Sequence, residues 1–411
     1  MSVRKRFFPD SIAGPNQAWV ADYVDAAGRR HRKQFKLKKD AEAYEKRAST
    51  EVADGTHIAP SDSITIEEAG DLWIKAKQRA GREQATIAQY RQHLDLHINP
   101  AIGHVKLPAL TPVVLSKFED ELHDAGRSAA MIKKVMVSLG SILANAQKRG
   151  HAVRNVVRDM RGLGNGADAR AEKRAKGKLR VGVDIPSPDE VKAFLGHLRG
   201  RWRPLMLVAV FGGLRASELR GLVWDDVDLV KGGVYVRQRA DRYNAIGRPK
   251  TETSERYVSL PALVVNALRE WRLVCPRKDT GKKGDAGQPA KVLQLVFPNG
   301  QGKVESLANI INRGLCPAMV RAGVTVDTGE VDAEGKPVLA AKYTGMHALR
   351  HFNASWLINS TKAGGLGLSP KEVQERLGHS SIVITMNTYS HLFERLDDGS
   401  EMSAAAAALL G

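Results

Sequence analysis

Two short segments in the second half of the chain carry histidine and arginine at spacings that could bind an anion. The segment HALRH places His347 and Arg350 three residues apart, and residues at this spacing share a face of a helix. An imidazole nitrogen and a planar guanidinium could therefore converge on one anionic group. Further along, LGHSSIVITMNTYSH places His379 after the helix-ending Gly378, and Tyr389 ten residues later. These residue types predict a site for an anionic substrate.

Other reaction classes lack the residues that they need. Metal-dependent phosphoryl transfer requires clustered carboxylates, and hydride transfer requires a glycine-rich turn after a strand. The sequence shows neither pattern. The two cysteines, Cys275 and Cys316, lie 41 positions apart, without a CxxC or Cys/His cluster. We therefore expect no zinc site, no disulfide and no cofactor.

Taken in order, these segments resemble the motifs of the tyrosine recombinase, or phage integrase, family. GLRASELRGL resembles the first arginine motif and points to Arg215, and GRPKTETSERYVSL resembles the hairpin that carries the lysine and points to Lys250. HALRH, LGHSS and TYSH supply the rest. The six site residues that the resemblance implies are Arg215, Lys250, His347, Arg350, His379 and Tyr389. Each motif alone is degenerate, but six positions in order are specific.

The resemblance implies a role for each residue, and the residue types suit those roles. Tyr389 would be the nucleophile, and a phenol of pKa near 10 needs a proton acceptor, for which His347 is our candidate. Arg215 and Arg350 would stabilise the non-bridging oxygens, with a hydrogen bond added by His379. Lys250 would give its proton to the leaving 5′ oxygen. The product would be a 3′-phosphotyrosyl link and a free 5′ hydroxyl.

Structural explanations compete with each of these roles. The arginines could cap helices or form salt bridges, and His351 is expected to pack rather than to catalyse. Tyr257 and Tyr243 are rival nucleophiles, and a buried, hydrogen-bonded tyrosine is the alternative for Tyr389. The glycine-rich residues between HALRH and LGH depart from the family pattern and could alter how His379 is presented.

The elements that must position these residues form a mixed α+β domain, expected over 186–395. Apolar spacing predicts helices at 187–198, 204–211, 261–273, 306–321, 346–358 and 370–377, and a strand pair at 234–238 and 256–260. The Gly/Lys/Asp-rich stretches 278–290 and 325–342 are predicted to be surface loops. A tail, 396–411, contains an alanine-rich run that we expect to be helical from 403.

Before this domain, residues 63–152 are predicted to form a four-helix bundle. Thr65 with Glu68 and Thr86 with Gln89 have the spacing of capping boxes. Thr111 before Pro112, and Ser128, are expected to open the other two helices. Residues 153–185 lack an apolar period and are predicted to be a basic linker.

The first 60 residues are predicted to form three short strands covered on one face by a helix at 40–52. The overall fold class is therefore multidomain and mainly α with small sheets. In this unit and in the linker, basic side chains are candidates for binding DNA: Arg29, Arg30, Arg32, Lys33, Lys36, Arg154, Arg158, Lys173, Arg174, Lys176 and Lys178. For the basic residues of the first unit, a solvated edge strand, on which basic side chains discourage aggregation, is an equally good explanation.

Charge favours a polyanionic partner. The 411 residues carry 63 Lys+Arg and 45 Asp+Glu, a net charge of +18, and residues 148–180 hold eleven basic and three acidic residues. No apolar run approaches the roughly 20 residues of a membrane helix, and the N-terminus lacks the apolar core of a signal peptide. We expect a cytoplasmic protein of a bacterial host, associated with the nucleoid and not with a membrane.

These observations and the resemblance predict a site-specific DNA recombinase that mediates integration and excision. The first unit would bind arm-type sites, the bundle and catalytic domain would enclose core-type DNA, and a homotetramer would join two attachment sites. A host DNA-bending protein and a directionality factor are possible partners. The alternatives are a type IB topoisomerase, a chromosome or plasmid dimer resolvase, and a non-catalytic DNA-binding regulator.

Overall fold

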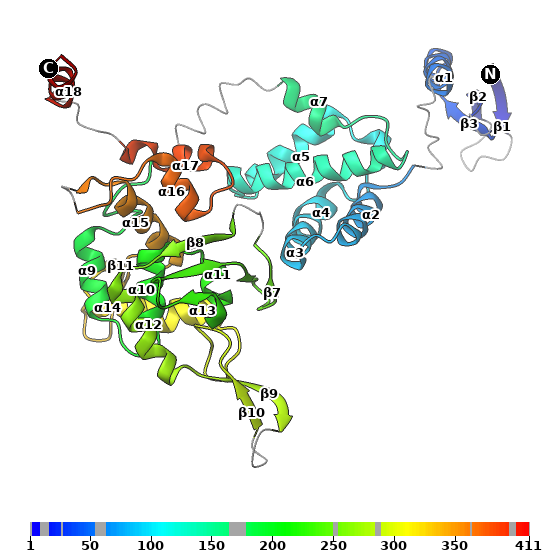
Figure 1. The fold of residues 1–411 in the computed structure, drawn as a ribbon. Coiled ribbons are helices and arrows are strands. Elements are labelled where there is room, and N and C mark those ends of the chain that lie inside the picture. Colours follow the sequence, from blue (N-terminus) through cyan, green and yellow to red (C-terminus); the bar gives the residue numbers. More distant parts are fainter. Residues whose placement is uncertain are drawn as a thin grey trace. The chain divides into compact units, whose positions relative to one another are not determined.

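The computed structural model describes residues 2–8, 16–25, 28–53, 63–163, 178–249, 254–283, 289–361, 364–393 and 400–410. The chain divides into two compact units, Met1–Lys173 and Arg174–Gly411. Four residues predicted to belong to the site or to bind DNA lie outside the described residues: Lys173, Arg174, Lys176 and Lys250. Figure 1 shows helices throughout, with small separate sheets. The fold class is the multidomain, mainly helical one that the sequence predicts.

The first unit begins with an antiparallel sheet in the order β1-β2-β3. Its elements are β1 (Ser2–Phe8), β2 (Asn16–Val24), β3 (Arg30–Phe35) and α1 (Lys38–Ala53). The ring of Tyr23 meets that of Tyr44 on α1 edge to face, with centroids 6.0 Å apart, so α1 covers the face on which Tyr23 lies. Alternation along β2 places Asp22 on the other face of the sheet.

The bundle follows in the same unit. Its elements are α2 (Ile66–Arg79), α3 (Gln84–His93), the π-helical turn η1 (Leu94–Ile98), α4 (Asn99–Ile102), the short turn η2 (Leu107–Ala109), α5 (Pro112–Asp124), α6 (Ala129–Lys148) and α7 (Val156–Leu163). α6 is long and apolar enough to span a membrane by composition. Seven of its residues, among them Val135 and Leu139, are buried, and they contribute to the core of the bundle.

Three of the four predicted helix starts are confirmed. Thr65 forms a complete capping box with Glu68, and the hydroxyls of Thr111 and Ser128 accept from the third residue of their helices. The prediction at Thr86 was wrong, because α3 begins two residues earlier with Glu83 at its cap. The linker expected over 153–185 is also corrected: Val156–Leu163 form α7, whose Val156 and Val157 are buried in the bundle core.

The second unit contains a three-stranded sheet in the order β4-β5-β8, and helices and strands share one hydrophobic core. Its elements are α9 (Pro188–Gly196), α10 (Trp202–Gly212), α11 (Ala216–Gly221), η3 (Trp224–Asp226), β4 (Val227–Asp228), β5 (Gly233–Val236), β6 (Arg239–Ala240), β7 (Ile246–Gly247), β8 (Arg256–Ser259), α12 (Ala262–Val274), α13 (Leu307–Asn309), η6 (Ile310–Leu315), α14 (Cys316–Arg321), α15 (Met346–Ile358), α16 (Pro370–Leu377), α17 (Ile382–Tyr389), η8 (Ser390–Leu392) and α18 (Ser400–Leu410). The predicted strand pair is confirmed as β5 and β8, with Val234 opposite Val258.

Two regions of this unit differ from the prediction. The stretches expected to be surface loops form antiparallel hairpins, β9 (Lys278–Lys283) with β10 (Pro289–Val292) and β11 (Thr325–Val331) with β12 (Pro337–Ala341). Their strands are rich in glycine and charge, and hairpins that project into solvent need no apolar face, so hydropathy did not reveal them. The helix expected over 306–321 is interrupted by the π-helical turn η6.

Candidate active site

The first site arginine stands at the start of a short helix. Arg215 precedes α11, and its backbone N–H donates to Oε2 of Glu218 at 2.9 Å. Its guanidinium Nη1 donates to Oε1 of the same carboxylate at 2.7 Å. Glu218 is 2% exposed. A buried carboxylate therefore fixes the orientation of Arg215, whose own side chain is 34% exposed.

A third arginine joins this pair from the strand β8. Arg256 donates to Glu218 through Nη2 at 2.9 Å, and its side chain is only 7% exposed. Burial would raise the pKa of Glu218, but the charge of Arg256, its hydrogen bond and the charge of Arg215 outweigh burial and lower that pKa. Glu218 is therefore ionised, and it compensates part of the positive charge of the two arginines.

The second site arginine lies beneath this group in α15. Arg350 is 2% exposed, and its Nη1 and Nη2 donate to the backbone oxygens of Gly213 at 2.6 Å and Leu377 at 2.5 Å. Burial, followed by the charge of Arg215, lowers the pKa of Arg350 to about 9. This value is still above neutral pH, so Arg350 keeps its charge.

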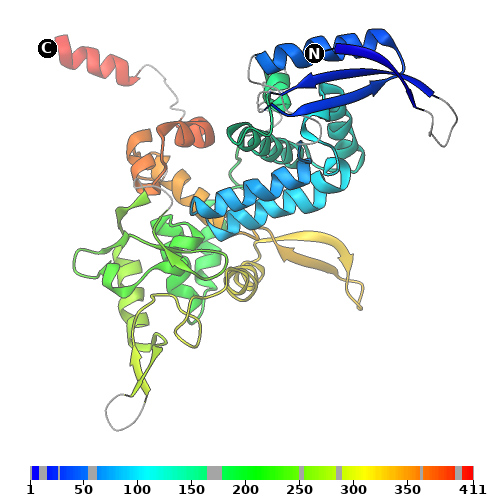
Figure 2. The ribbon, with the colours of Figure 1, turned by 90° about the vertical axis from the view of Figure 1, so that its right-hand side faces the viewer.

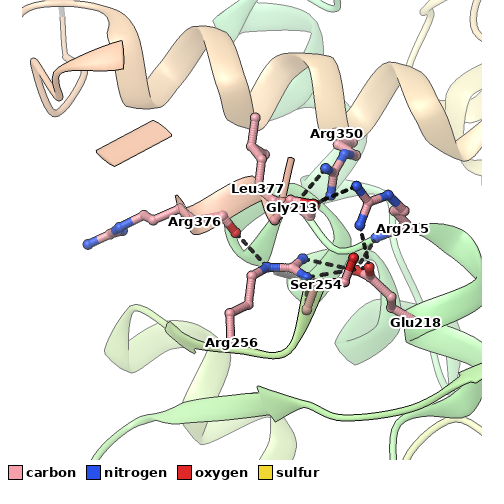
Figure 3. Close-up of polar contacts among 9 residues, drawn as sticks. Gly213, Arg215, Glu218, Ser254, Arg256, Arg350, Arg376 and Leu377 are labelled. Atoms are coloured by element: carbon pink, nitrogen blue, oxygen red, sulfur yellow. Dashed lines mark hydrogen bonds and ion pairs between the residues drawn. The ribbon is translucent and has the colours of Figure 1, made fainter. Parts of the chain in front are cut away.

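Three arginines from three separate elements converge on consecutive carbonyls at the end of α16 (Figure 3). Arg256 donates to Arg376 O at 2.7 Å, Arg350 to Leu377 O, and Arg215 to Gly378 O at 2.8 Å. The last carbonyls of a helix have no partner inside the helix and carry partial negative charge, so guanidinium groups satisfy them. We call Arg215, Arg256 and Arg350 the arginine cluster. With Glu218 as its bonded carboxylate, the cluster retains excess positive charge.

Gly378 makes this approach possible. It adopts a left-handed conformation with φ 64° at the end of α16, which glycine reaches without strain. A Cβ at this position would lie 2.7 Å from Nη1 of Arg256. The predicted helix end at Gly378 is thus also the point where a side chain would block the cluster.

His379 follows directly and is almost buried. Its Nδ1 is 2.9 Å from Oγ1 of Thr385 on α17, a hydrogen bond that fixes the ring. Burial, then the charges of Arg350 and Arg215, lower the pKa of His379 to about 4. The imidazole is therefore neutral near pH 7. The glycine-rich residues before α16 fold back onto α15, with Leu368 N–H donating to Leu357 O at 2.9 Å.

Tyr389 ends α17 and is 2% exposed. Its hydroxyl is 2.7 Å from Nδ1 of His351, and its ring stacks parallel to that of His379 with centroids 6.4 Å apart. Burial raises the pKa of Tyr389 to about 12, although the charge of Arg350 opposes this shift. The phenol is therefore protonated and enclosed in this arrangement.

The two histidines of HALRH lie side by side on α15. The rings of His347 and His351 meet edge to face with centroids 4.6 Å apart, as expected from a spacing of four residues. Burial, then the charge of Arg350, lower the pKa of His347, and burial followed by the charge of His347 lowers that of His351 to about 4. His347 is nevertheless exposed to solvent, and it is His351, not His347, that contacts Tyr389.

The rival tyrosines lie elsewhere. Tyr257 pairs with Tyr235 across the sheet, with ring centroids 4.9 Å apart, and Tyr243 is 42% exposed in the turn between β6 and β7. Among the described residues, Tyr389 is the tyrosine that contacts the histidines of HALRH. Sequence reasoning missed Glu218, Arg256 and the role of His351 as the partner of Tyr389. Glu218 could have been found from the sequence, because it lies three residues after Arg215 and residues at this spacing are neighbours on a helix.

In the first unit, the candidate DNA-binding arginines are partly engaged within the protein. Arg30 donates to both oxygens of Asp22, at 2.7 and 2.6 Å, and Arg32 lies 3.4 Å from the same carboxylate. Arg29 pairs with Asp25 at 3.0 Å. Their side chains are still half exposed or more, at 60%, 53% and 50% for Arg29, Arg30 and Arg32.

The lysines and the remaining linker residues are arranged differently. Lys33 lies on the other face, with Nζ 4.7 Å from the ring centroid of Tyr44. Lys36, Arg154, Arg158 and Lys178 are exposed.

Comparison with known proteins identifies the family. The family model described as "Phage integrase family" matches residues 187–395, a span that includes the whole arginine cluster and Tyr389. The chain belongs to the phage integrase family. A second model, the "Phage integrase, N-terminal SAM-like domain", matches residues 65–123.

Relatives and solved structures agree with this membership. A "Tyrosine recombinase XerC-like" of Caldanaerobacter subterraneus is 26% identical over 387 residues, 90% of each chain. "Tyrosine recombinase XerC" of Xylella fastidiosa strain M23 is 29% identical, covering 76% of this chain and 87% of that one. The Tn1549 transposon integrase in complex with a circular intermediate DNA has a TM-score of 0.59 at 18% identity, covering 84% of this chain and all of that one.

A lambda integrase dimer bound to a COC′ core site has a TM-score of 0.50 at 18% identity, covering 95% of both chains. These two structures show the shared fold. The family match and the named relatives make this integrase-family chain a site-specific DNA recombinase.

Proposed function

We propose that the chain cleaves and rejoins DNA by transesterification, with Tyr389 forming a 3′-phosphotyrosyl intermediate. The observation that carries this proposal is the meeting of three arginines, three histidines with lowered pKa and one tyrosine near the end of α16. Guanidinium groups stay charged through the reaction and can bind the non-bridging oxygens of a phosphodiester. The excess positive charge of the arginine cluster suits a substrate that brings negative charge with it.

The accessible and enclosed residues suggest an order of events. Arg215 is partly exposed and His347 is exposed, so a phosphodiester can reach them first, whereas Tyr389 is enclosed. Displacement of α17 or its neighbours must then bring the phenol to the phosphorus. His347, neutral and beside the arginines, is the base that we assign to Tyr389 in that rearranged site. Lys250 remains our candidate for the proton donor to the 5′ oxygen.

The covalent link conserves the energy of the phosphodiester bond, so the step balances without ATP. Tyr389 Oη forms a bond to phosphorus as the bond to the 5′ oxygen breaks, and the phenolic proton passes to the base. The leaving oxygen takes up a proton from the acid. Reversal by a different 5′ hydroxyl exchanges the strands, which is integration or excision.

We further propose a homotetramer that joins two attachment sites in the cytoplasm of a bacterial host, in association with the nucleoid. Exchange requires four cuts, and a "lambda integrase tetramer bound to a Holliday junction" has a TM-score of 0.50 with this chain. The exposed Met402, Leu409 and Leu410 of α18 offer an apolar surface for a neighbouring protomer. The first 60 residues would bind arm-type sites through Arg30, Arg32 and their neighbours, assisted by a host DNA-bending protein and a directionality factor.

A nicked core-type duplex tests the chemistry. The nick lets the short 5′ fragment diffuse away, so the covalent adduct accumulates and is counted on a denaturing gel. We expect an adduct with the wild-type chain and none with Tyr389→Phe, which should still bind the duplex in a mobility-shift assay. An equal adduct yield from the phenylalanine variant would refute the proposal. Binding without an adduct by the wild-type chain would favour the non-catalytic regulator.

A further inference from the structure

Two hairpins project from the second unit. One is β9–β10 and the other is β11–β12. In Figure 2 the first, in yellow-green, extends below the unit, and the second, in gold, extends to the side. Their tips therefore point in different directions, and they do not meet within one protomer.

The two hairpins are built in the same way. Both carry the sequence Asp-Thr-Gly, at 279–281 and at 327–329. Gly281 N–H donates to Asp279 at 2.8 Å and Thr280 donates to Ala290 O at 2.7 Å. In the second hairpin, the equivalent bonds are Gly329 to Asp327 at 2.9 Å and Thr328 to Val338 O at 2.8 Å.

The pairing of the strands matches as well. Asp279 lies opposite Lys291, and Asp327 lies opposite Leu339, so each aspartate pairs with the residue twelve positions later in the chain. Both ladders shift register after this point, as a β-bulge requires. The two insertions are therefore equivalent frameworks, and they differ in the side chains that they carry.

Those side chains give the hairpins opposite charge. Residues 277–292 contain five basic and two acidic residues, whereas residues 325–341 contain four acidic residues and one lysine. On β9–β10 the described basic side chains are exposed: Arg277, Lys278, Lys282 and Lys291. On β11–β12 all four carboxylates are exposed: Asp327, Glu330, Asp332 and Glu334. The net charge from the sequence is equal in size and opposite in sign.

The acidic hairpin also exposes apolar side chains. Val326, Val331 and Leu339 are 44%, 68% and 51% exposed. The register pairs Asp327 with Leu339 and Val326 with Ala340, so Val326 and Leu339 lie on opposite faces of the hairpin and do not form one apolar patch. An acidic surface repels a phosphate backbone, so DNA is not the partner of β11–β12.

We propose that β9–β10 of one protomer docks on β11–β12 of a second copy of this chain. The opposite charges of the two hairpins attract each other. The contact is head to tail, because it joins two different surfaces, and such contacts close into a ring when the rotation allows. This inference rests on the proposed assembly of four protomers, and it assigns a second contact between neighbours beside the one proposed for α18.

Charge reversal of each hairpin tests this contact. One variant carries Lys278→Glu and Lys282→Glu, and the other carries Glu330→Lys and Glu334→Lys. These four side chains make no described ion pair and leave the Asp-Thr-Gly bonds intact. Glu270→Lys, on the exposed surface of α12, is the control. Assembly on two core-type duplexes is followed by native gel and by mass photometry, and single-site cleavage by the adduct assay.

Each double variant alone should assemble at least about tenfold more weakly, because every contact in its ring then joins like charges. An equimolar mixture of the two should recover assembly. In an alternating ring, the unchanged basic hairpin of one variant faces the unchanged acidic hairpin of the other, and the two reversed hairpins face each other. The Glu270→Lys control should assemble as the wild type does.

Three results would overturn the contact. If the mixture assembles no better than its components, the hairpins do not meet between protomers. If the variant with Lys278→Glu and Lys282→Glu loses affinity for a single duplex, and the variant of β11–β12 behaves as wild type, β9–β10 binds DNA instead. If neither variant affects assembly, the hairpins hold nothing together. A wild-type chain that forms no adduct would refute the proposed function, and that result is read separately from assembly.

Discussion

The hydroxyl of Tyr389 lies 2.7 Å from Nδ1 of His351, and the exposed His347 touches the other side of the same imidazole. The nearest base to the nucleophile is thus the second histidine of HALRH. Because Tyr389 is 2% exposed and burial raises its pKa to about 12, this contact stabilises the protonated, enclosed tyrosine. We interpret it as a resting contact that DNA binding must break.

Paired histidine variants separate the resting contact from proton transfer. His347→Ala should slow adduct formation by roughly 10²- to 10⁴-fold, the usual contribution of a general base. His351→Ala should leave the single-turnover rate within a fewfold of wild type. It should also make the phenol of Tyr389 titrate at a lower pH, as measured by ultraviolet absorbance. The reverse pattern of rates would assign the base to His351.

Removal of the buried carboxylate should destabilise the arginine cluster. Glu218→Gln leaves Arg215 and Arg256 without their counter-charge, and loss of one member of a buried ion pair costs about 3 kcal/mol of unfolding free energy. The control is Asp226→Asn, a buried carboxylate with one arginine partner, Arg237, that is 57% exposed, so a smaller loss than for Glu218→Gln is expected. Denaturant unfolding with and without sulfate measures both.

Sulfate should recover more stability for Glu218→Gln than for the wild-type chain, because the freed arginines can bind the anion. Equal costs for Glu218→Gln and Asp226→Asn, together with no sulfate effect, would show that Glu218 does not balance the cluster.

Acid should destabilise the second unit through its buried histidines. His351 and His379 have pKa values lowered to about 4, against about 6.5 for a free histidine. Between these values the unfolded chain binds protons that the folded chain does not, so the unfolding free energy falls as pH falls from about 6.5 to about 4. Thermal unfolding of wild type and of His379→Gln over this range should show a shallower slope for the variant. Identical slopes would contradict the lowered pKa of His379.

Lys250 lies outside the described residues, so chemistry must test it. If it protonates the leaving 5′ oxygen, Lys250→Ala should slow cleavage by roughly 10²- to 10⁴-fold. A substrate with sulfur at the bridging 5′ position leaves readily as a thiolate and should restore most of that rate. Arg215→Ala should gain nothing from the sulfur, because it acts on the non-bridging oxygens. Equal rescue of both variants would remove Lys250 as the acid.

Much of the fold was predictable because the signals are local. The caps at Thr65, Thr111 and Ser128 and the exact bounds of α15 and α16 follow from residue types within one turn. α7 was missed because its two buried valines at 156 and 157 lie in a basic stretch, where net charge concealed a short apolar face.

The site was predictable in its residues and less so in its contacts. The resemblance to the family's motifs points to Arg215, Arg350, His379 and Tyr389. The binding of three arginines to successive carbonyls depends instead on how α11, β8 and α15 meet the end of α16. The spacing of apolar residues predicts single helices and strands, but it does not predict how these elements pack against the end of α16. The choice of His351 over His347 as the partner of Tyr389 is likewise set by the position of α17, which sequence spacing does not fix.

Peptide mapping of the covalent adduct tests the central claim most directly. After trapping on the nicked core-type duplex, nuclease and protease digestion should leave one modified peptide, carrying a phosphonucleotide on Tyr389. The account predicts this mass on the peptide that contains Tyr389, linked through the 3′ phosphate, and no modified tyrosine elsewhere. A 5′ linkage, or an adduct on Tyr257 or Tyr243, would contradict it.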